Sequence, residues 1–570
     1  MTTFLRILLI LTLLTSAIPA SAIDRLATIS ALRNEGLQAS RVMDHLTWLA
    51  DVYGPRTTGS PAIFEASDWA MEEMKSWGLT KVHRDHFLFG MGWALERSAI
   101  RMVGPQPMQV IGYPIGWTPG TPGMVSGELI RADLLTPTNL SAWRGKLRGK
   151  IVLIQPPRDV RPIALPLTHR FTDEELRGLR ENIPIGPQWR RGERSNGELA
   201  TATASQSSAR GLYGSQDSSS RNAWLDELIE FLKAEGVIAV FERGSDTTDR
   251  PAVAFQQLLN TQRTQRIDGG TVQTRLAENA GADAAERLLP WLVIAVEHYN
   301  RMARIVELGQ RPTVELDIAV NWYPEPPQGN GFNTFGDIQG SEKPDEFVIL
   351  GAHLDGLHPA TAAVDNAAGV AVVMEAMRLL RSVGVRPKRT IRLALWGGEE
   401  HGLLGSRAFV TQNFGDPFAG ATNSASARKV AAYLNIDNGS GRIRGLYARH
   451  NLDAIPVLER WIEPLRDLGV TTVSPMATAS EISEGRMFAG SDHLYFDAVG
   501  IPALDMIQDR LDYFSRTYHS NMDFLDRASR PDLVQASVVF AVLAYQAAMD
   551  DEPLPRRAPG PALIESMDRN

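Results

Sequence analysis

The stretch FVILGAHLD, residues 347–355, decides how the rest of the chain is interpreted. Its first six residues are all apolar or glycine, and a run of this length is typical of a strand buried on both faces of a sheet. The run ends abruptly at His353 and Asp355. In open α/β sheets, ligands bind just beyond the carboxyl ends of the strands. The stretch therefore predicts both a fold class and the position of a site.

A second acid, Asp365, follows a short loop and stands where a helix is expected to begin. The residues after it carry apolar side chains at the spacing of one helical face, at Val370, Val373, Met374, Met377 and Leu380. This pattern predicts a helix over residues 366–382. The local order is therefore strand, polar loop and helix.

The same order repeats along the C-terminal half of the chain. The predicted strands cover 347–352, 390–396, 430–436 and 501–507, and the predicted helices cover 366–382, 403–410, 453–468 and 531–549. This alternation predicts an α/β fold with a mostly parallel central sheet flanked by helices.

The N-terminal half has a different character. Two helices are expected over 41–50 and 62–77, and a strand over 82–87. From about 95 to 320 short β-like runs dominate, at 124–130, 150–154, 237–241, 292–296 and 313–320, which predicts a β-rich inserted domain. Within it, residues 156–222 are polar and rich in serine, and we expect mobile loops there.

Composition excludes several classes of protein. The 570 residues carry a net charge of −8, so the chain lacks the excess of basic residues that nucleic-acid-binding proteins have.

Residues 1–22 have a lone cation, a short apolar run and the small-residue end Ala-Ser-Ala, and this pattern predicts a secretory signal peptide rather than a membrane anchor. The mature protein is thus expected to be exported, periplasmic or secreted, and free of the membrane. Oligomers are possible.

The chain contains no cysteine, so any metal must be held by His, Asp and Glu side chains. That ligand set favours zinc, or a harder divalent ion such as manganese. Candidate ligands follow successive predicted strands or lie in nearby loops, namely His353, Asp365, Glu400, Asp437 and His519. Two imidazoles and three carboxylates that converge at one sheet edge would suit two Zn²⁺ ions. Glu399, beside Glu400, is the expected general base.

These residues carry a resemblance to a known family. The set described above, together with the phrases Gly490-Ser491-Asp492-His493 and Tyr518-His519-Ser520-Asn521-Met522-Asp523, resembles the M28 family of di-zinc exopeptidases. Residues 127–130, 149–154 and 235–240 resemble a protease-associated (PA) domain, inserted as in the branch of the family that includes carboxypeptidase Q.

The resemblance implies a domain plan. It comprises a signal peptide (1–22), an N-terminal part of the peptidase domain (23–94), an inserted PA-like domain (95–320) with the polar insertion 156–222, the main part of the peptidase domain (321–552) and a C-terminal tail (553–570).

The resemblance also implies a role for each candidate residue. His353 and Asp437 would hold one zinc, Glu400 and His519 the other, and Asp365 would bridge them. Glu399 would be the general base, Asp355 would orient His353 through its ring N–H, and Tyr518 would steady the oxyanion. A cis peptide bond after Asp365 is also expected. Apart from the resemblance, His358 and His401 flank these motifs and could face the cleft, but we expect both at the surface.

The implied activity is hydrolysis of a peptide or dipeptide at one chain end. The sequence leaves open whether the amino or the carboxyl end is cleaved, because specificity is expected in loops such as 470–490 and in the inserted domain. Two alternatives stay open, a non-catalytic receptor or interaction protein of the same fold and acyl transfer of the glutaminyl cyclase kind. Loss of metal ligands would mark the first, and a single zinc would mark the second.

Overall fold

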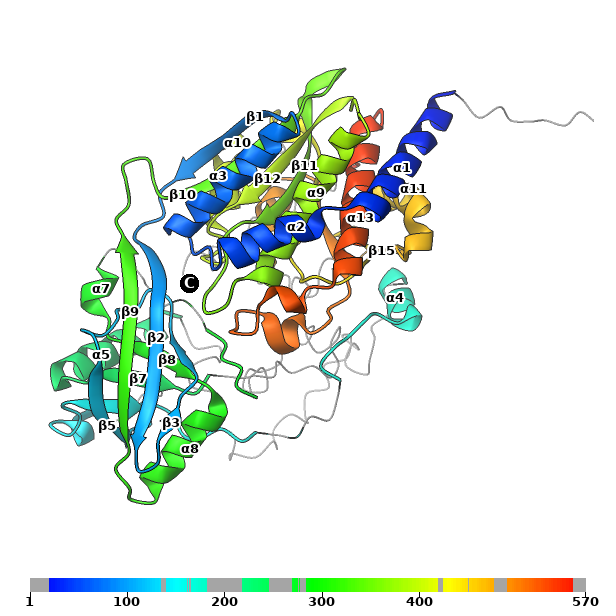
Figure 1. The fold of residues 1–570 in the computed structure, drawn as a ribbon. Helices are drawn as coiled ribbons and strands as arrows, with labels where there is room; N and C mark the ends of the chain where they lie inside the picture. The colour runs from blue at the N-terminus through cyan, green and yellow to red at the C-terminus, as the bar shows by residue number, and fades with distance from the viewer. Residues whose placement is uncertain are drawn as a thin grey trace, which may run out of the picture.

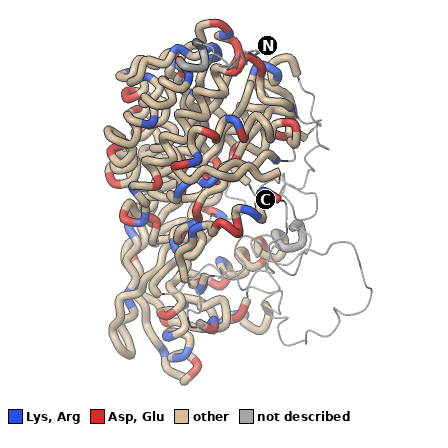
Figure 2. Tube along the Cα trace, turned by 90° about the vertical axis from the view of Figure 1, so that its right-hand side faces the viewer, with Lys and Arg blue, Asp and Glu red and all other residues tan. Residues whose placement is uncertain are grey.

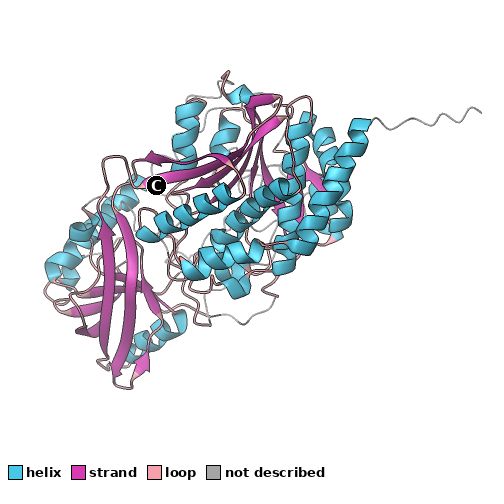
Figure 3. Ribbon diagram, turned by 45° about the horizontal axis from the view of Figure 1, so that its top comes forward, coloured by secondary structure: helices cyan, strands magenta, loops and turns pink. Residues whose placement is uncertain are grey.

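The computed structural model describes residues 20–134, 140–160, 162, 166–181, 218–244, 269–274, 276, 283–418, 424–449, 451–475 and 490–556. These residues form two lobes, each built around an eight-stranded sheet (Figures 1 and 3). The larger lobe contains most of the helices, and the smaller one contains the long strands at the lower left of Figure 1.

The sheet of the larger lobe is mixed at its edges and parallel at its centre. Its strands, in spatial order, are β1 (Thr80–Phe87), β10 (Gly331–Ile338), β12 (Arg389–Trp396), β11 (Lys343–His353), β13 (Val430–Asn435), β16 (Ala503–Gln508), β14 (Ile443–Tyr447) and β15 (Thr472–Ser474). The four central strands β12, β11, β13 and β16 are parallel to one another. Their carboxyl ends therefore lie along one edge of the sheet.

Helices cover both faces of this sheet. One face packs against α1 (Ala20–Ala39), α2 (Val42–Thr47), α3 (Pro61–Ser76), α9 (Ala368–Ser382), α11 (Ile455–Ile462) and α13 (Arg530–Met549), and the other against α10 (Leu404–Asn413) and α12 (His493–Ala498). Along β11, Val348 and Leu350 enter the first core and Ile349 enters the second. Because both faces of β11 are buried, its sequence is a continuous apolar run in this part of the strand.

The smaller lobe is built from residues between Gly92 and Tyr323. Its sheet order is β3 (Met108–Gln109), β2 (Gly92–Gly104), β9 (Thr313–Tyr323), β5 (Val125–Arg131), β6 (Lys150–Leu153), β7 (Ala239–Glu242), β8 (Trp291–Ile294) and β4 (Gly112–Pro114). Helices α5 (Ser218–Glu235) and α7 (Ala284–Arg287) pack on one face, and α8 (Val296–Glu307) packs on the other.

Two segments of the smaller lobe's sequence contact the larger lobe. Residues 272–274 lie against the loop 519–521, where the backbone N–H of Thr274 donates to the carbonyl of His519 at 2.9 Å. Residues 166–181 include α4 (Asp173–Arg180), which packs near β15 with Leu176 and Leu179 buried. The backbone N–H of Phe171 donates to Asp509 at 2.9 Å.

Most of the predicted elements are present within a few residues of their expected limits. The expectation of loops throughout 156–222 is wrong in two places, since α4 forms at 173–180 and α5 begins at Ser218. Thr172 and Glu175 form a reciprocal capping box that starts α4 despite its polar sequence. Residues 182–217 of this insertion lie outside the described part of the chain, as do residues 1–19 of the predicted signal peptide.

Among the described helices, α13 alone is long and apolar enough to match a membrane span, and it is a mostly buried core helix. Basic and acidic residues are interspersed over both lobes in the described part of the chain (Figure 2).

Candidate metal centre

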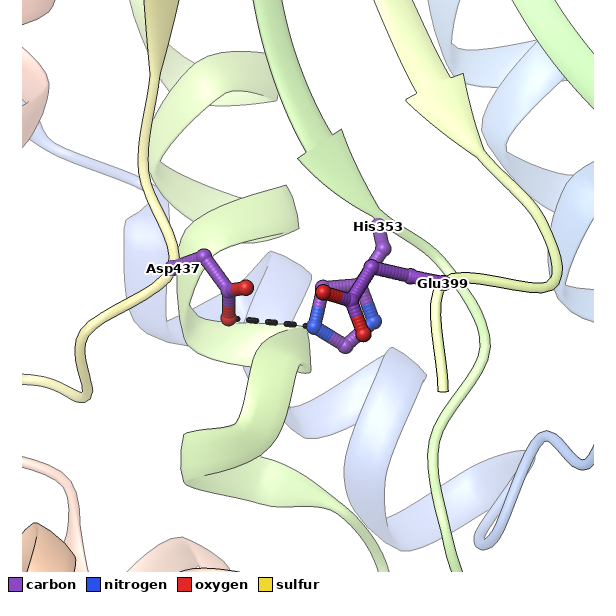
Figure 4. Close-up of side chains that lie close together, drawn as sticks. All are labelled: His353, Glu399 and Asp437. Atoms are coloured by element: carbon purple, nitrogen blue, oxygen red, sulfur yellow. Dashed lines mark hydrogen bonds and ion pairs between the residues drawn. The ribbon is translucent and has the colours of Figure 1, made fainter. Parts of the chain in front are cut away.

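The candidate residues come together at the carboxyl edge of the larger sheet. His353 is the last residue of β11, Glu399 and Glu400 lie in the turn after β12, and Asp437 follows β13 by two residues. Figure 4 shows His353, Glu399 and Asp437 converging from three separate segments. Asp365 comes from the connection before α9, and His519 from the loop before α13.

Five of these side chains form one continuous series of contacts. His353 Nε2 lies 3.0 Å from Asp437 Oδ1 and 3.4 Å from Asp365 Oδ1. The other oxygen of Asp365, Oδ2, lies 3.5 Å from His519 Nε2, which in turn lies 3.0 Å from Glu400 Oε2. Asp365 therefore presents one carboxylate oxygen to each imidazole and stands at the middle of the series.

Asp365 is held in place by its backbone. The peptide bond between Asp365 and Asn366 is cis, as expected, and both residues have non-helical backbone angles, so α9 begins only at Ala368. The carboxylate of Asp523 accepts hydrogen bonds from the backbone N–H groups of Val364 at 2.6 Å and Asp365 at 3.1 Å. Burial raises the pKa of Asp523 to about 8, and the charge of Asp365 adds to the rise.

Asp355 holds the turn that carries the two glutamates. Its Oδ1 accepts from the backbone N–H of Glu399 at 3.2 Å, and its Oδ2 accepts from that of Glu400 at 3.3 Å and from the hydroxyl of Thr58 at 3.0 Å. His353 Nδ1 is nearer to the carbonyl oxygen of Asp355, at 3.0 Å, than to its carboxylate, at 3.6 Å. The carboxylate of Asp355 thus positions the glutamates at least as directly as it positions His353.

The electrostatics of the metal-free cluster favour protons on its members. Burial raises the pKa of Glu399 well above its usual range, and Asp437 adds to the rise against the charge of His353. Burial also raises the pKa of Glu400. The pKa of His353 is raised because neighbouring carboxylates outweigh its burial. The cluster is thus stabilised by bound protons, and bound cations could take the place of those protons.

The donor set fits divalent metal ions. Oδ2 of Asp365 and Oε1 of Glu400 are buried and accept no hydrogen bond from the described residues. Buried carboxylate oxygens without donors are costly unless a cation binds them. Two groups have ligand atoms close enough for one ion each, namely His353 with Glu399 and Asp437, and His353 with Asp365 and Glu400. Oxygen and imidazole nitrogen together suit zinc.

Tyr518 lies against the last of the predicted ligands. Its ring stacks on the imidazole of His519, with centroids 3.7 Å apart and planes at 22°. Burial raises the pKa of Tyr518 well above its usual range, so its hydroxyl stays protonated. His519 adopts a left-handed backbone (φ 54°), and its carbonyl accepts from Thr274 of the smaller lobe.

Sequence reasoning missed several residues near the cluster and misplaced two. Asp492 has both carboxylate oxygens buried without a hydrogen-bond partner among the described residues, and burial raises its pKa to about 8. The phrase 490–493 carries part of the family resemblance, but nothing in it indicates that the acid is buried. Asp523 ends the phrase 518–523, but nothing in that phrase indicates its hydrogen bonds to the backbone of residues 364 and 365, about 160 positions away.

His358 and His401 were expected at the surface, and the structure places both differently. His358 is 1% exposed, with Nε2 2.7 Å from the carbonyl oxygen of Pro114, and burial lowers its pKa to about 4. His401 is half-buried between the rings of Trp117 and Phe89, at 4.5 and 4.6 Å. Both misplacements have one reason, which is that the covering residues come from segments some 240 to 310 positions away.

A parallel α/β sheet with histidines and carboxylates gathered at its carboxyl edge defines a class of α/β proteins with a candidate metal centre at that edge. Residues 333–544 match the model of peptidase family M28.

Known proteins agree with this assignment. Carboxypeptidase Q of Mus musculus is 29% identical over 268 residues, which are 47% of this chain and 52% of that protein. The chain thus spans about half the length of the curated relatives it matches.

Two solved structures resemble the fold. A peptidase M28 precursor from Shewanella amazonensis superposes with a TM-score of 0.60 at 22% identity, covering 95% of this chain and all of that one. A zinc aminopeptidase from Bacillus subtilis gives a TM-score of 0.50 at 16% identity, covering 92% and 98%. At these identities the likeness concerns the fold alone.

Proposed function

We propose that this protein is an exported, zinc-dependent exopeptidase that hydrolyses a peptide bond at one end of a short peptide. The observation that carries the proposal is the continuous series of contacts from Asp437 through His353, Asp365 and His519 to Glu400. Such a series of alternating carboxylates and imidazoles has little use as a structural core, because it leaves buried acceptors without donors.

The residues would divide between two zinc ions. His353 and Asp437 would hold one, His519 and Glu400 the other, and Asp365 would contact both through its two oxygens. Bound zinc would supply the acidity that lets water attack near neutral pH and positive charge opposite the carbonyl oxygen.

Glu399 is the proposed general base. Its half-buried carboxylate lies beside His353 and Asp437, and its raised pKa in the metal-free protein reflects burial and neighbouring acids. It would accept the proton of the attacking water and deliver it to the leaving amine. Asp355 would fix the position of Glu399 through the backbone, and the protonated Tyr518 would donate to the carbonyl oxygen as negative charge develops there.

The proposed substrate is a peptide or dipeptide. Names among the similar proteins include both carboxypeptidase and aminopeptidase, so they support exopeptidase chemistry and leave the terminus open. Residues 476–489, where specificity was expected, lie outside the described part of the chain. The predicted signal peptide at 1–22 supports export to the periplasm or beyond.

The test is the Glu399→Gln variant together with metal analysis. Wild-type protein is expected to bind two zinc ions per chain and to hydrolyse unblocked dipeptides. The variant is expected to keep its zinc and to lose activity by about 10²- to 10⁴-fold, the usual effect of removing a general base. Near-normal turnover in a zinc-loaded variant would refute the assignment of Glu399. A folded wild-type protein that binds no zinc would refute the enzyme proposal.

A further inference from the structure

Part of the smaller lobe's sequence is docked on the larger lobe, where the proposed chemistry gives it no role. This strap consists of residues 166–181, and its helix α4 lies beside β15 of the larger lobe (Figure 1). Leu176 and Leu179 are buried, and the hydroxyl of Ser474 in β15 donates to the carbonyl of Leu179 at 2.8 Å. The strap is therefore packed into the larger lobe.

The first residues of the strap pair with the segment 509–515, which follows β16. The backbone N–H of His169 donates to the carbonyl of Leu511 at 2.9 Å, and the N–H of Leu511 donates back to the carbonyl of His169 at 2.8 Å. The hydroxyl of Ser515 donates to the carbonyl of Leu167 at 2.6 Å. The strap and this segment are thus joined through their backbones, as neighbouring strands are.

Arg170 adds the charged contacts between the strap and the larger lobe. Its Nη1 lies 3.1 Å from Oδ2 of Asp509, and its Nη2 lies 2.7 Å from Oδ2 of Asp532. Both carboxylates are 1% exposed, whereas the side chain of Arg170 is 47% exposed. The backbone N–H of Phe171 donates to the other oxygen of Asp509. Because buried carboxylates need such donors, Arg170 ties the strap to the start of the segment and to α13.

The segment that the strap holds leads directly to two residues of the proposed site, Tyr518 and His519. The backbone N–H of Tyr518 donates to the carbonyl of Tyr513 at 2.9 Å, and the two tyrosine rings lie edge to face with centroids 5.4 Å apart. The ring of Tyr518 in turn stacks on the imidazole of His519. A shift of residues 511–513 would therefore be passed on to His519.

The other end of this loop is held by residues 272–274, which also belong to the smaller lobe's sequence. The backbone N–H of Thr274 donates to the carbonyl of His519 at 2.9 Å, and that of Asn521 donates to the carbonyl of Val272 at 3.1 Å. The loop that carries His519 is thus held on both sides by inserted sequence. The proposed ligands of the other zinc ion end or follow strands of the larger sheet instead.

We propose that the strap positions the loop 509–519 for zinc binding, with Arg170 as the positioning residue, so that the zinc site of His519 and Glu400 is complete only when the strap is docked. This proposal rests on the proposed peptidase function and gives the inserted sequence a role in that same metal centre. The physical reason is preorganisation. A ligand that is correctly placed only part of the time lowers the apparent affinity for the metal by the fraction of time it is misplaced.

The experiment uses variants of the full-length chain. Arg170→Met removes the charge and keeps an apolar stem, and Arg170→Lys keeps a charge that reaches one acid at a time. In a strap replacement, a glycine–serine linker of equal length takes the place of residues 167–181. The matched control is Arg177→Met, because Arg177 is exposed on the same helix and its side chain pairs with no acid among the described residues.

Three quantities are measured for each variant. Zinc is titrated into the metal-free protein against a competing chelator, which gives the affinity of each of the two ions. Hydrogen exchange reports the opening of residues 511–519 before zinc is added. The melting temperature and the kcat and KM for dipeptide hydrolysis, at limiting and at saturating zinc, are recorded on the same samples.

The strap replacement is expected to weaken one of the two zinc ions by about 10- to 100-fold, the usual effect of changing groups that support metal ligands, and Arg170→Met by about 10-fold. Hydrogen exchange of residues 511–519 should become faster, and kcat should fall at limiting zinc and recover at saturating zinc. Arg170→Lys should restore part of the loss, and Arg177→Met should change nothing. In a His519→Ala background, Arg170→Met should not weaken the remaining ion.

Equal weakening of both zinc ions, or a lower melting temperature at unchanged zinc affinity, would mean that the strap only stabilises the fold and would overturn the proposal. Should the strap replacement fail to fold, Arg170→Met decides, because it leaves the backbone contacts of the strap in place. Failure of the peptidase function itself would look different, since the wild-type protein would then bind fewer than two zinc ions or hydrolyse no dipeptide.

Discussion

Replacing Asp355 by Asn tests how the two glutamates are positioned. The carboxylate accepts three hydrogen bonds, of 3.0, 3.2 and 3.3 Å, and is 1% exposed. An asparagine whose oxygen occupies the place of Oδ2 keeps the bonds from Thr58 and Glu400. Its NH₂ group then faces the backbone N–H of Glu399, so one charge-assisted bond is lost and two donors meet.

The expected effect follows from that one lost bond. A hydrogen bond to a charged group contributes about 1.5–3 kcal/mol, which corresponds to about 10- to 100-fold in rate if the displaced Glu399 no longer reaches its proton. The assay is kcat for dipeptide hydrolysis at saturating zinc, with zinc content and melting temperature measured on the same sample.

The control is Thr58→Val, which removes the hydroxyl donor and leaves both backbone bonds to Asp355. It should lower the melting temperature, because one hydrogen bond to a charged group is lost, and it should lower the rate by less than Asp355→Asn does, because the bond that positions Glu399 is kept. An Asp355→Asn variant that retains its zinc and turns over within threefold of wild type would refute the reasoning. The carboxylate would then merely fill space.

Two further predictions concern stability. Glu375 is fully buried between Arg378, at 2.8 Å, and His45, at 3.3 Å, and these contacts lower its pKa to about 2 against its burial. Glu375→Gln should destabilise the protein by about 3 kcal/mol above pH 4.5, a difference that disappears as the pH falls towards 2, and thermal unfolding across that range measures it. Chelation of zinc should lower the melting temperature by more at pH 8 than at pH 5, because Glu399 and His353 have raised pKa values in the metal-free protein and lose their stabilising protons as the pH rises. A constant gap between the chelated and zinc-loaded proteins would contradict this last expectation.

The strands that sequence reasoning missed show where hydropathy fails. β10 contains Asn333, Thr334 and Asp337, all buried, and its pattern does not resemble a core strand. Each polar group has a partner far along the chain, such as Arg392, which pairs with Asp337 at 2.8 Å. The spacing of apolar residues along one strand cannot reveal a buried polar residue of this kind, because its hydrogen-bond partner belongs to another element.

The sequence by itself determined the parallel core of the larger lobe and the residues that gather at its edge. Buried parallel strands are continuous apolar runs in the sequence. The polar residue that follows each run lies at the common carboxyl edge of the sheet, so residues that end different runs can be recognised as spatial neighbours. His353, Glu399, Glu400 and Asp437 could be assembled in this way without coordinates.

The tertiary structure alone decided the order of contacts within the cluster and everything that supports it. The hydrogen bonds of Asp523 to the backbone of Asp365 and of Asp355 to the two glutamates join segments separated by up to about 160 residues. Burial, hydrogen-bond satisfaction and charge balance are properties of a residue's surroundings, and the linear order of the chain does not contain those surroundings until it folds.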